Sequence, residues 1–436
     1  MIEFLDRHFH ISERGSNVKL ELIGGLTCFL AMAYILAVNA GILSAAGMPF
    51  TPLVVATAVS AAFGTLLTAL MANVPFAQAP GLGLNATFVY TLCMQLGYTW
   101  QQALALVFIS GLIFLGITLS PLRNKIVDAI PGPLKRAITV GIGLFITLIG
   151  LFNSGIVSAN DNLLSMGNIT SGAPLVAIIG LIITIILVTF KVKGAIFFSI
   201  ILATLIGIPL GVTNTNITLS FKDVTFAPLF FKLSFTGLLT IGIIPLITNI
   251  LTLTMCDMFD TVSTLIGCAS GANMLDENGN MKDKTMSRGL IADAVATCAG
   301  ALCGTSTVTH FVESATAVAS GARTGLAAVV TGLLFVISIF FAPLFGIIPL
   351  AATAPALMMV GVYMMQSVTK IDFNDIDIAI PAFLTLAMIP FTYSLSTGLG
   401  FGFISWTIIK LVRGKYKEIS PLMYVLTAVF ILMFIL

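Results

Sequence analysis

Four acidic residues lie well inside apolar stretches of the sequence: Asp257, Asp260, Asp293 and Glu313. No Lys or Arg lies at comparable depth in these stretches to neutralise them. A carboxylate in an apolar interior costs at least about 2.5 kcal/mol, so an unpaired one indicates function. The alternative, strongest for Asp293, is a carboxylate that caps the backbone of a neighbouring helix. Buried carboxyl groups without cations are also candidates to carry a proton.

The spacing of these acids predicts two different relationships. Asp257 and Asp260 are three residues apart and so share one helix face, where two like charges cannot both ionise cheaply. Glu313 follows His310 by three residues, and the two side chains interact if that segment is helical. His310 is a secondary candidate, because a lone buried histidine is more often a structural residue. The proton-coupling candidates are Glu313, Asp257, Asp260, Asp293 and His310.

Donors to a ligand are expected from two other places in the chain. Asn85 follows Gly81 and Gly83, which allow the backbone to approach a ligand closely. Capping of a helix N-terminus is an equally good role for Asn85, and both roles can hold together. Thr307, with its two preceding hydroxyl residues, is expected to stand before a short helix whose N–H groups face Asn85.

Phenylalanines flank these groups in the sequence, at Phe76, Phe88, Phe259 and Phe311. Stacking rings together with carboxylate acceptors suit a flat heterocycle with ring N–H groups. A neutral or weakly acidic ligand fits better than an anion, which the carboxylates would repel. Because the chain contains 32 Phe residues, most of them are expected to be core or lipid-facing side chains.

The amino-acid composition indicates the class of protein in which this site lies. The chain has 436 residues, of which 58% are apolar and 9% are charged, whereas a soluble domain has about 25% charged residues. These values exclude a soluble globule and a disordered chain, and they indicate a polytopic membrane protein. A net charge of +2 gives no footprint for nucleic acid. The six cysteines lack CxxC spacing, so we expect no disulfide, metal or cofactor.

The positive charges predict the orientation. With the N-terminus in the cytoplasm, all but two of the 20 Lys and Arg residues fall on the cytoplasmic side, and the exceptions are Lys222 and Lys232. The first twenty residues are polar and of mixed charge, so they do not resemble a cleaved signal. We expect a multi-pass protein of the plasma (inner) membrane with a cytoplasmic N-terminus. Residues 376–412 are expected to form two short segments joined at Ser396 to Gly398. This hairpin crosses the membrane either completely or only halfway.

Two segments are too short and too interrupted to be plain membrane helices: 75–90, rich in Pro and Gly, and 304–320, rich in Ser and Thr. Irregular backbone at membrane depth is tolerated only where protein or a water-filled cavity covers it. The segments lie about 225 residues apart, an offset of seven spans, so the second copy of the repeat must be inverted. Interrupted segments at corresponding positions of inverted repeats indicate a transport site at the membrane midplane.

Several motifs, in order along the chain, resemble the adenine/guanine/hypoxanthine permease branch of the nucleobase/ascorbate (nucleobase:cation symporter-2) transporters. They are GLTCFLAMAYILAVNAGIL (25–43), NVPFAQAPGLGLNATFVY (73–90), DMFDTVSTLIG (257–267), the segment 291–326 and ATAPALMMVGVYMM (352–365). The resemblance implies an all-α fold of about 14 segments as a 7+7 inverted repeat, with short extended strands in broken segments 3 and 10. It also implies a cytoplasmic N-terminus (1–20), a core domain (21–120 and 236–343) and a gate domain (121–235 and 344–436).

By this resemblance the chain takes up a purine nucleobase by proton symport and is not an enzyme. The substrate-binding residues are then expected to be Asp257, Asp260, Glu313, Asn85, Gly83, Phe259 and Thr307. Departures from the family's usual residues at Cys28, Ser263 and His310 leave the preferred purine open. Coupling to Na⁺ and a homodimer remain alternatives. Two other functions compete: an intramembrane metal-dependent enzyme that uses the Asp257/Asp260 pair, and an anion carrier or channel of the same fold.

Overall fold

The computed structural model describes residues 2–120, 129–160, 163–170, 172–215, 224–272, 274–275 and 281–435. Arg123, Lys125 and Lys222, which contribute to the orientation argument, lie outside these ranges. Within them, ten helices are long and apolar enough to cross a membrane, and three shorter apolar helices accompany them. The predicted helical, polytopic fold is therefore confirmed.

The first half of the chain contains the elements of the first repeat. In order they are α1 (Ile2–Phe9), η1 (Ser12–Arg14), α2 (Val18–Met32), α3 (Ile35–Ser44), α4 (Phe50–Ala72), β1 (Gln78–Pro80), α5 (Leu82–Ala86), the π-helical η2 (Thr87–Gln95), α6 (Trp100–Leu119), α8 (Gly132–Asn153), β2 (Val157–Asn160), β3 (Leu163–Met166), α9 (Gly172–Thr189) and α10 (Ala195–Gly207). The first span is interrupted at Ala33 and Tyr34, between α2 and α3.

The second half begins with one unbroken helix. It comprises α11 (Ile243–Gly271), α12 (Asp283–Cys303), β4 (Val308–His310), η4 (Val312–Ser314), α13 (Ala315–Ala319), α14 (Gly325–Ser338), η5 (Ile339–Phe341), α15 (Ala342–Phe345), α16 (Leu350–Met365), η6 (Gln366–Lys370), α17 (Ile376–Thr392), α18 (Leu395–Val412), η7 (Tyr416–Glu418) and α19 (Pro421–Ile435).

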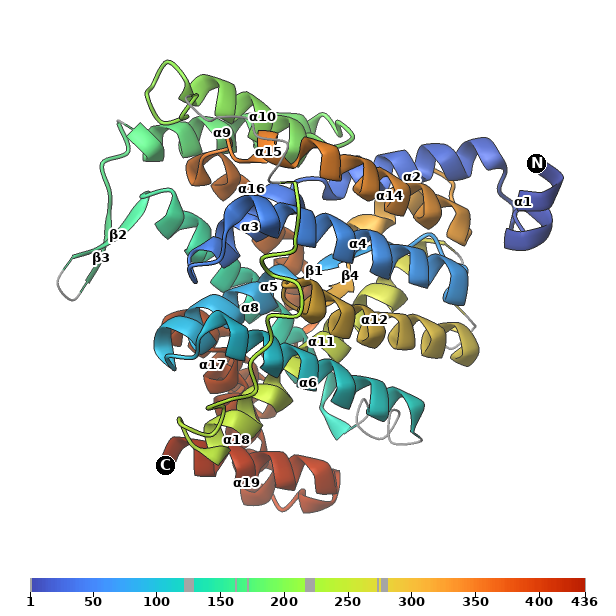
Figure 1. Ribbon diagram of the computed structural model, residues 1–436. Helices are drawn as coiled ribbons and strands as arrows, with labels where there is room; N and C mark the ends of the chain where they lie inside the picture. Colours follow the sequence, from blue (N-terminus) through green and yellow to red (C-terminus); the bar gives the residue numbers. More distant parts are fainter. Residues whose placement is uncertain are drawn as a thin grey trace.

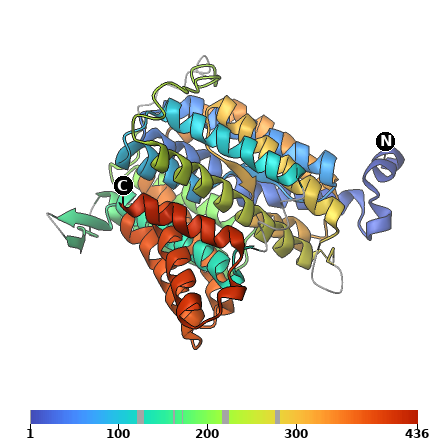
Figure 2. The same ribbon diagram turned by 90° about the horizontal axis from the view of Figure 1, so that it is seen from below.

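Helices from the two halves interleave in one layer. The helix α4 packs against α12 and α14, α6 packs against α12, and α2 packs against α14 (Figures 1 and 2). Small residues permit this close approach. A Cβ added at Gly325 would lie 2.4 Å from the carbonyl oxygen of Ala69, and one added at Gly25 would lie 2.5 Å from that of Ala327.

A second group of helices lies beside this layer, and its members pack against one another. The helix α8 packs against α16 and α17, and α9 packs against α10 and α16. Figure 2 shows the C-terminal helices (red) below the blue, cyan and yellow helices of the first layer. The hairpin α17–α18 turns at Tyr393, which has a left-handed φ of 52°, and at Ser394. The expected joint at Ser396 to Gly398 was therefore wrong by a few residues, because those residues already belong to α18.

The two interrupted segments meet at the centre of the molecule (Figure 1). The strands β1 and β4 pair antiparallel, with Gln78 opposite His310 and Pro80 opposite Val308. Two hydrogen bonds extend the pairing, from Phe311 N to the Ala77 oxygen (3.0 Å) and from Gly81 N to the Thr307 oxygen (2.9 Å). The pairing satisfies backbone groups that an interrupted helix would leave exposed in an apolar environment. The strands predicted in segments 3 and 10 are thus confirmed.

Two acids outside the four singled out above are also buried, and both have partners. Glu21 on α2 accepts hydrogen bonds from the backbone N–H groups of Arg323 (2.8 Å), Thr324 and Ala327, at the N-terminus of α14. Such groups have no partner within their own helix, and a negative charge there is favourable. Asp377 lies 2.8 Å from Arg413 Nε and 3.2 Å from Lys415 Nζ. These two acids therefore stabilise the fold at helix ends.

Candidate functional site

A cavity of about 200 Å³ lies beside the β1–β4 pair. One side is formed by the turn into α5, by α11, and by the end of β4 with η4; the other side is formed by α8 and α16. We call this the central cavity. Its polar lining residues are Tyr34, Thr139, Asp260, Ser263, Thr264, Thr309, His310, Glu313, Tyr363 and Ser367.

Two of the four predicted acids, Asp260 and Glu313, line the central cavity. The hydroxyl of Tyr34 donates a hydrogen bond of 2.7 Å to Glu313 Oε1. Sequence reasoning missed Tyr34. Its signal in the sequence is a polar aromatic inside the apolar first span, which does not by itself identify a partner. Tyr363 and Thr309 also line the cavity and were missed. The arrangement presents carboxylate acceptors and hydroxyl groups to whatever occupies the cavity.

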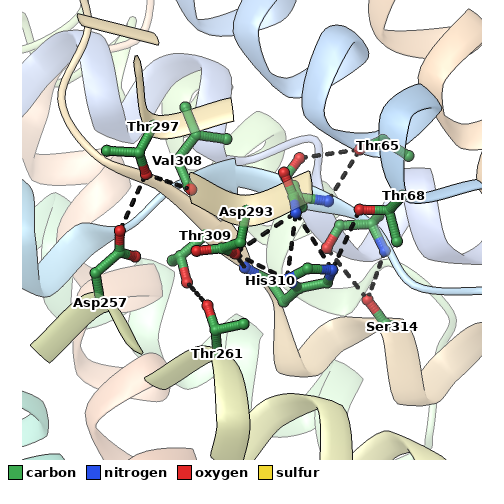
Figure 3. A network of polar contacts seen from close by, with 12 residues as sticks. Thr65, Thr68, Asp257, Thr261, Asp293, Thr297, Val308, Thr309, His310 and Ser314 are labelled. Carbon is green, nitrogen blue, oxygen red and sulfur yellow. Dashed lines mark hydrogen bonds and ion pairs between the residues drawn. The ribbon is translucent and has the colours of Figure 1, made fainter. Parts of the chain in front are cut away.

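Asp257 is buried but does not line the central cavity. Its Oδ2 accepts a hydrogen bond of 3.0 Å from Thr297 Oγ1 on α12 (Figure 3). Its Oδ1 has no hydrogen-bond partner among the described residues. The structure thus separates the two acids of α11: Asp260 faces the cavity, whereas Asp257 faces α12.

Asp293 and His310 form a fully buried pair behind the strands (Figure 3). Asp293 Oδ1 lies 2.8 Å from His310 Nδ1 and accepts the backbone N–H of His310 at 3.1 Å. The Nε2 of the same ring lies 3.2 Å from Thr68 Oγ1. The carboxylate therefore caps a strand rather than a helix. The expected contact between His310 and Glu313 required a helical segment. His310 instead belongs to β4 and directs its ring toward Asp293, so the expected contact is not observed.

Asn85 joins the two broken segments to each other. Its amide nitrogen donates to Asn39 Oδ1 (2.6 Å), and its Oδ1 accepts a hydrogen bond from Ser306. Asn39 in turn donates to Thr57 and Thr305. Capping by Asn85 is not observed, since the residue at the N-cap of α5 is Gly81. Asn85 is fully buried and lies outside the cavity lining.

Thr307 also lies behind the central cavity. It is buried, and its Oγ1 has no hydrogen-bond partner among the described residues. It does not stand directly before a helix as expected, because β4 intervenes and η4 begins only at Val312. Its contribution is made through the backbone, where its carbonyl accepts the N–H of Gly81.

Gly83 lines the central cavity, and Phe259 does not. A Cβ added at Gly83 would lie 2.3 Å from Ile142 Cγ2 on α8, so the close approach that this glycine permits includes a helix. Lys135 Nζ lies over the ring of Phe259, 5.4 Å from its centre. Lys135, from the first turn of α8, thus lies against the residue that precedes Asp260 in the sequence. Of the four flanking phenylalanines, Phe311 lines the cavity.

A second cavity of about 470 Å³ adjoins the first. Val312, Glu313 and Tyr363 line both cavities. At its other end lie Lys191, Lys193 and Gly194, between α9 and α10, and the end of α13. There Lys193 Nζ lies 3.4 Å from Ser320 Oγ. We call this second cavity the vestibule. Glu313 stands where the vestibule and the central cavity meet.

Among the residues that the structure describes, no group of three or more His, Cys, Asp or Glu side chains could hold a metal ion. The six cysteines are free thiols.

Comparison with known proteins places the chain in a family. A family model described as a permease family matches residues 19–401. The chain belongs to the nucleobase/ascorbate transporter family, in its purine permease branch. This permease is 42% identical to the guanine/hypoxanthine permease PbuG of Bacillus subtilis, over 98% of both chains. It is 37% identical to the adenine permease AdeP of Escherichia coli, over 98% of this chain and 95% of the relative.

Solved structures show the same fold at low sequence identity. The transmembrane domain of the cyanobacterial bicarbonate transporter BicA matches this permease with a TM-score of 0.64 and 16% identity. The match covers 87% of this chain and 97% of that domain. At this identity the likeness concerns the fold alone. Membership of a permease family points to a transporter rather than to the metal-dependent enzyme considered from the acidic pair.

Proposed function

We propose that this permease is a secondary transporter that takes up a purine nucleobase together with a proton. The observation that carries the proposal is the pair Asp260 and Glu313, two carboxylates on the wall of one cavity. Carboxylates accept hydrogen bonds, and a purine base presents ring N–H groups and, in some cases, an amino group. An anionic substrate would be repelled by the same pair.

Each part of the cavity has a role in this proposal. Asp260 and Glu313 accept N–H groups of the base, and the backbone around Gly83 lies against its edge. Phe311 supplies an aromatic surface on the same wall. Asp257, Asn85 and Thr307, which lie behind the cavity, hold α11 and the two broken segments in place. The relatives named as guanine/hypoxanthine and adenine permeases support a purine as the substrate.

Glu313 is the first candidate for the coupled proton. It lines the vestibule as well as the central cavity, so one carboxyl group contacts both spaces. Asp257, Asp260 and the pair of Asp293 and His310 are further candidates, because each is a titratable group near the strands. We propose that the core domain (21–120 and 236–343) moves against the gate domain (121–235 and 344–436) around this site. The distribution of Lys and Arg supports a cytoplasmic N-terminus. We propose the plasma membrane as the location.

The experiment is uptake of labelled hypoxanthine, adenine and guanine into cells that express the chain. We expect uptake to collapse with an uncoupler and to fall on competition by unlabelled purines at two pH values. Glu313→Gln keeps the size of the side chain but removes its charge, and we expect it to abolish uptake at normal membrane expression. Glu13→Gln, at a highly exposed position, is the matched control and keeps full uptake.

Three results would each contradict a part of the proposal. Competition by uracil without competition by purines would assign a different substrate class. Normal uptake by Glu313→Gln would remove Glu313 from the mechanism. Uptake driven by a Na⁺ gradient and indifferent to the uncoupler would replace the proton by Na⁺.

A further inference from the structure

Tyr34 contacts the acid at the centre of the site from the opposite repeat. It stands at the interruption of the first span, between α2 and α3, and its side chain is buried. Its hydroxyl donates to Glu313 Oε1 at 2.7 Å, across 279 positions of sequence. Because Tyr34 and Glu313 both line the central cavity, the bond lies at the cavity wall.

An ionised carboxylate is an acceptor only, with two oxygens and several lone pairs. A hydrogen bond to such a charged group is shorter and stronger than one between neutral groups. The Tyr34 hydroxyl therefore fixes the direction of the Glu313 carboxylate and occupies one of its oxygens. A hydrogen-bond donor in the central cavity then meets an acceptor that is already oriented, which lowers the entropy lost on binding.

We propose that Tyr34 is a positioning residue for the substrate: it holds one oxygen of Glu313, so that the carboxylate accepts an N–H of the base with its remaining lone pairs. The proposal rests on the proposed function, because it takes the base as the ligand of Glu313. It assigns Tyr34 a role in affinity and in the response to pH, and no direct bond to the base is required.

The groups that face Glu313 determine how its protonation responds. They are Cys28 on α2, Asp260 and Cys268 on α11, Tyr363 on α16, and Lys191 and Lys193 between α9 and α10. His310 on β4 lines the same cavity but directs its ring toward Asp293. Tyr34 is the group for which a hydrogen bond to the Glu313 side chain is observed within the described residues. Its hydroxyl stabilises the ionised form more than the protonated form, because the charged oxygen is the better acceptor.

The test is Tyr34→Phe, which removes the hydroxyl and keeps the ring. We expect the purified variant to bind labelled hypoxanthine or adenine about tenfold more weakly, as the loss of one well-placed charged hydrogen bond implies. We also expect the pH at which uptake is half-maximal to change, since the hydroxyl that contacts the Glu313 carboxyl group is gone. The matched control is Tyr98→Phe, which removes a buried hydroxyl that donates to the Leu238 carbonyl at 3.1 Å. This control should leave the pH of half-maximal uptake unchanged.

A second background separates positioning from damage to the fold. In Glu313→Gln, adding Tyr34→Phe should change the binding affinity by less than about twofold, because the charged acceptor is already gone. The proposal is overturned if Tyr34→Phe binds like the unmodified chain, or if it weakens binding equally in both backgrounds. Uptake of the unmodified chain without any pH dependence would contradict proton coupling instead, and the binding comparison alone would then decide the role of Tyr34.

Discussion

At the scale of single residues, two acids on one helix acquire different surroundings. Asp257 and Asp260 are three residues apart on α11, which places their side chains about 60° apart around the helix axis. This rotation suffices for Asp260 to line the central cavity while Asp257 accepts a hydrogen bond from Thr297. In the proposed mechanism, Asp260 therefore contacts the base and Asp257 supports the position of α11 against α12.

The two acids are distinguished by their asparagine variants. Asp260→Asn replaces an acceptor oxygen by an amide donor, and we expect the affinity for the base to fall at least about tenfold, as expected when a charged hydrogen bond is lost. Asp257→Asn keeps an amide oxygen that can accept from Thr297, so we expect its affinity to stay within about twofold. Binding of labelled adenine or hypoxanthine to each purified variant is the measurement. An equal loss of affinity in both variants would contradict the assignment.

Residue types predicted some residues of this site. Contacts between residues far apart in the sequence could not be predicted. An unpaired carboxylate inside an apolar stretch is costly and therefore indicates function, so Asp260 and Glu313 could be found from the sequence. Tyr34 could not be assigned, because its partner lies 279 positions away and a tyrosine in an apolar span has many roles. The surroundings of Phe259 were not predicted for a related reason: its ring packs under Lys135, and only the fold brings α8 and α11 together.

At the scale of elements, local composition predicted the interruptions but not their pairing. Pro and Gly in 75–90 and hydroxyl residues in 304–320 disfavour a continuous helix, so both broken segments could be located. The register that sets Gln78 opposite His310 depends on how the two repeats meet, which local sequence does not contain. The π-helical form of η2 was likewise not predicted, since its residues alone do not distinguish it from an α-helix.

The contact between α5 and α8 yields a prediction about the seam between the proposed core and gate. A Cβ at Gly83 would meet Ile142 Cγ2 at 2.3 Å, closer than real side chains come, so one of the two elements must shift. We expect Gly83→Ala to slow purine uptake at least about fivefold at normal expression, consistent with about 1 kcal/mol or more of overpacking. Ile142→Ala in the same chain removes the opposing atoms and should restore most of the rate.

A matched control is available within the first repeat. Gly116→Ala on α6 adds a Cβ that meets nothing within 4 Å, and it should leave uptake unchanged. If Gly83→Ala transports normally, or if Ile142→Ala does not relieve its effect, the seam between α5 and α8 does not limit the transport cycle.

At the scale of the whole molecule, the central cavity and the vestibule meet at Glu313. The far end of the vestibule is bounded by the segment between α9 and α10 on one side and by α13 on the other. Two contacts cross there: Lys193 Nζ reaches Ser320 Oγ at 3.4 Å, and Gly194 packs so closely on α2 that an added Cβ would lie 3.2 Å from Leu30 Cβ. If the core domain moves against the gate domain, these contacts must change during each cycle.

Linking the two sides of the vestibule should therefore stop transport. Cysteines introduced as Lys193→Cys and Ser320→Cys, in a chain whose six native cysteines are replaced, can be joined by a bifunctional thiol reagent about as long as the lysine side chain that it substitutes. We expect the joined protein to lose net purine uptake and a reducing agent to restore it, because a fixed link prevents the domains from separating. Each single-cysteine variant, treated in the same way, should keep its uptake. Undiminished uptake by the joined protein would show that this seam stays closed throughout the cycle, and the passage of the base would then have to be sought on another side of Glu313.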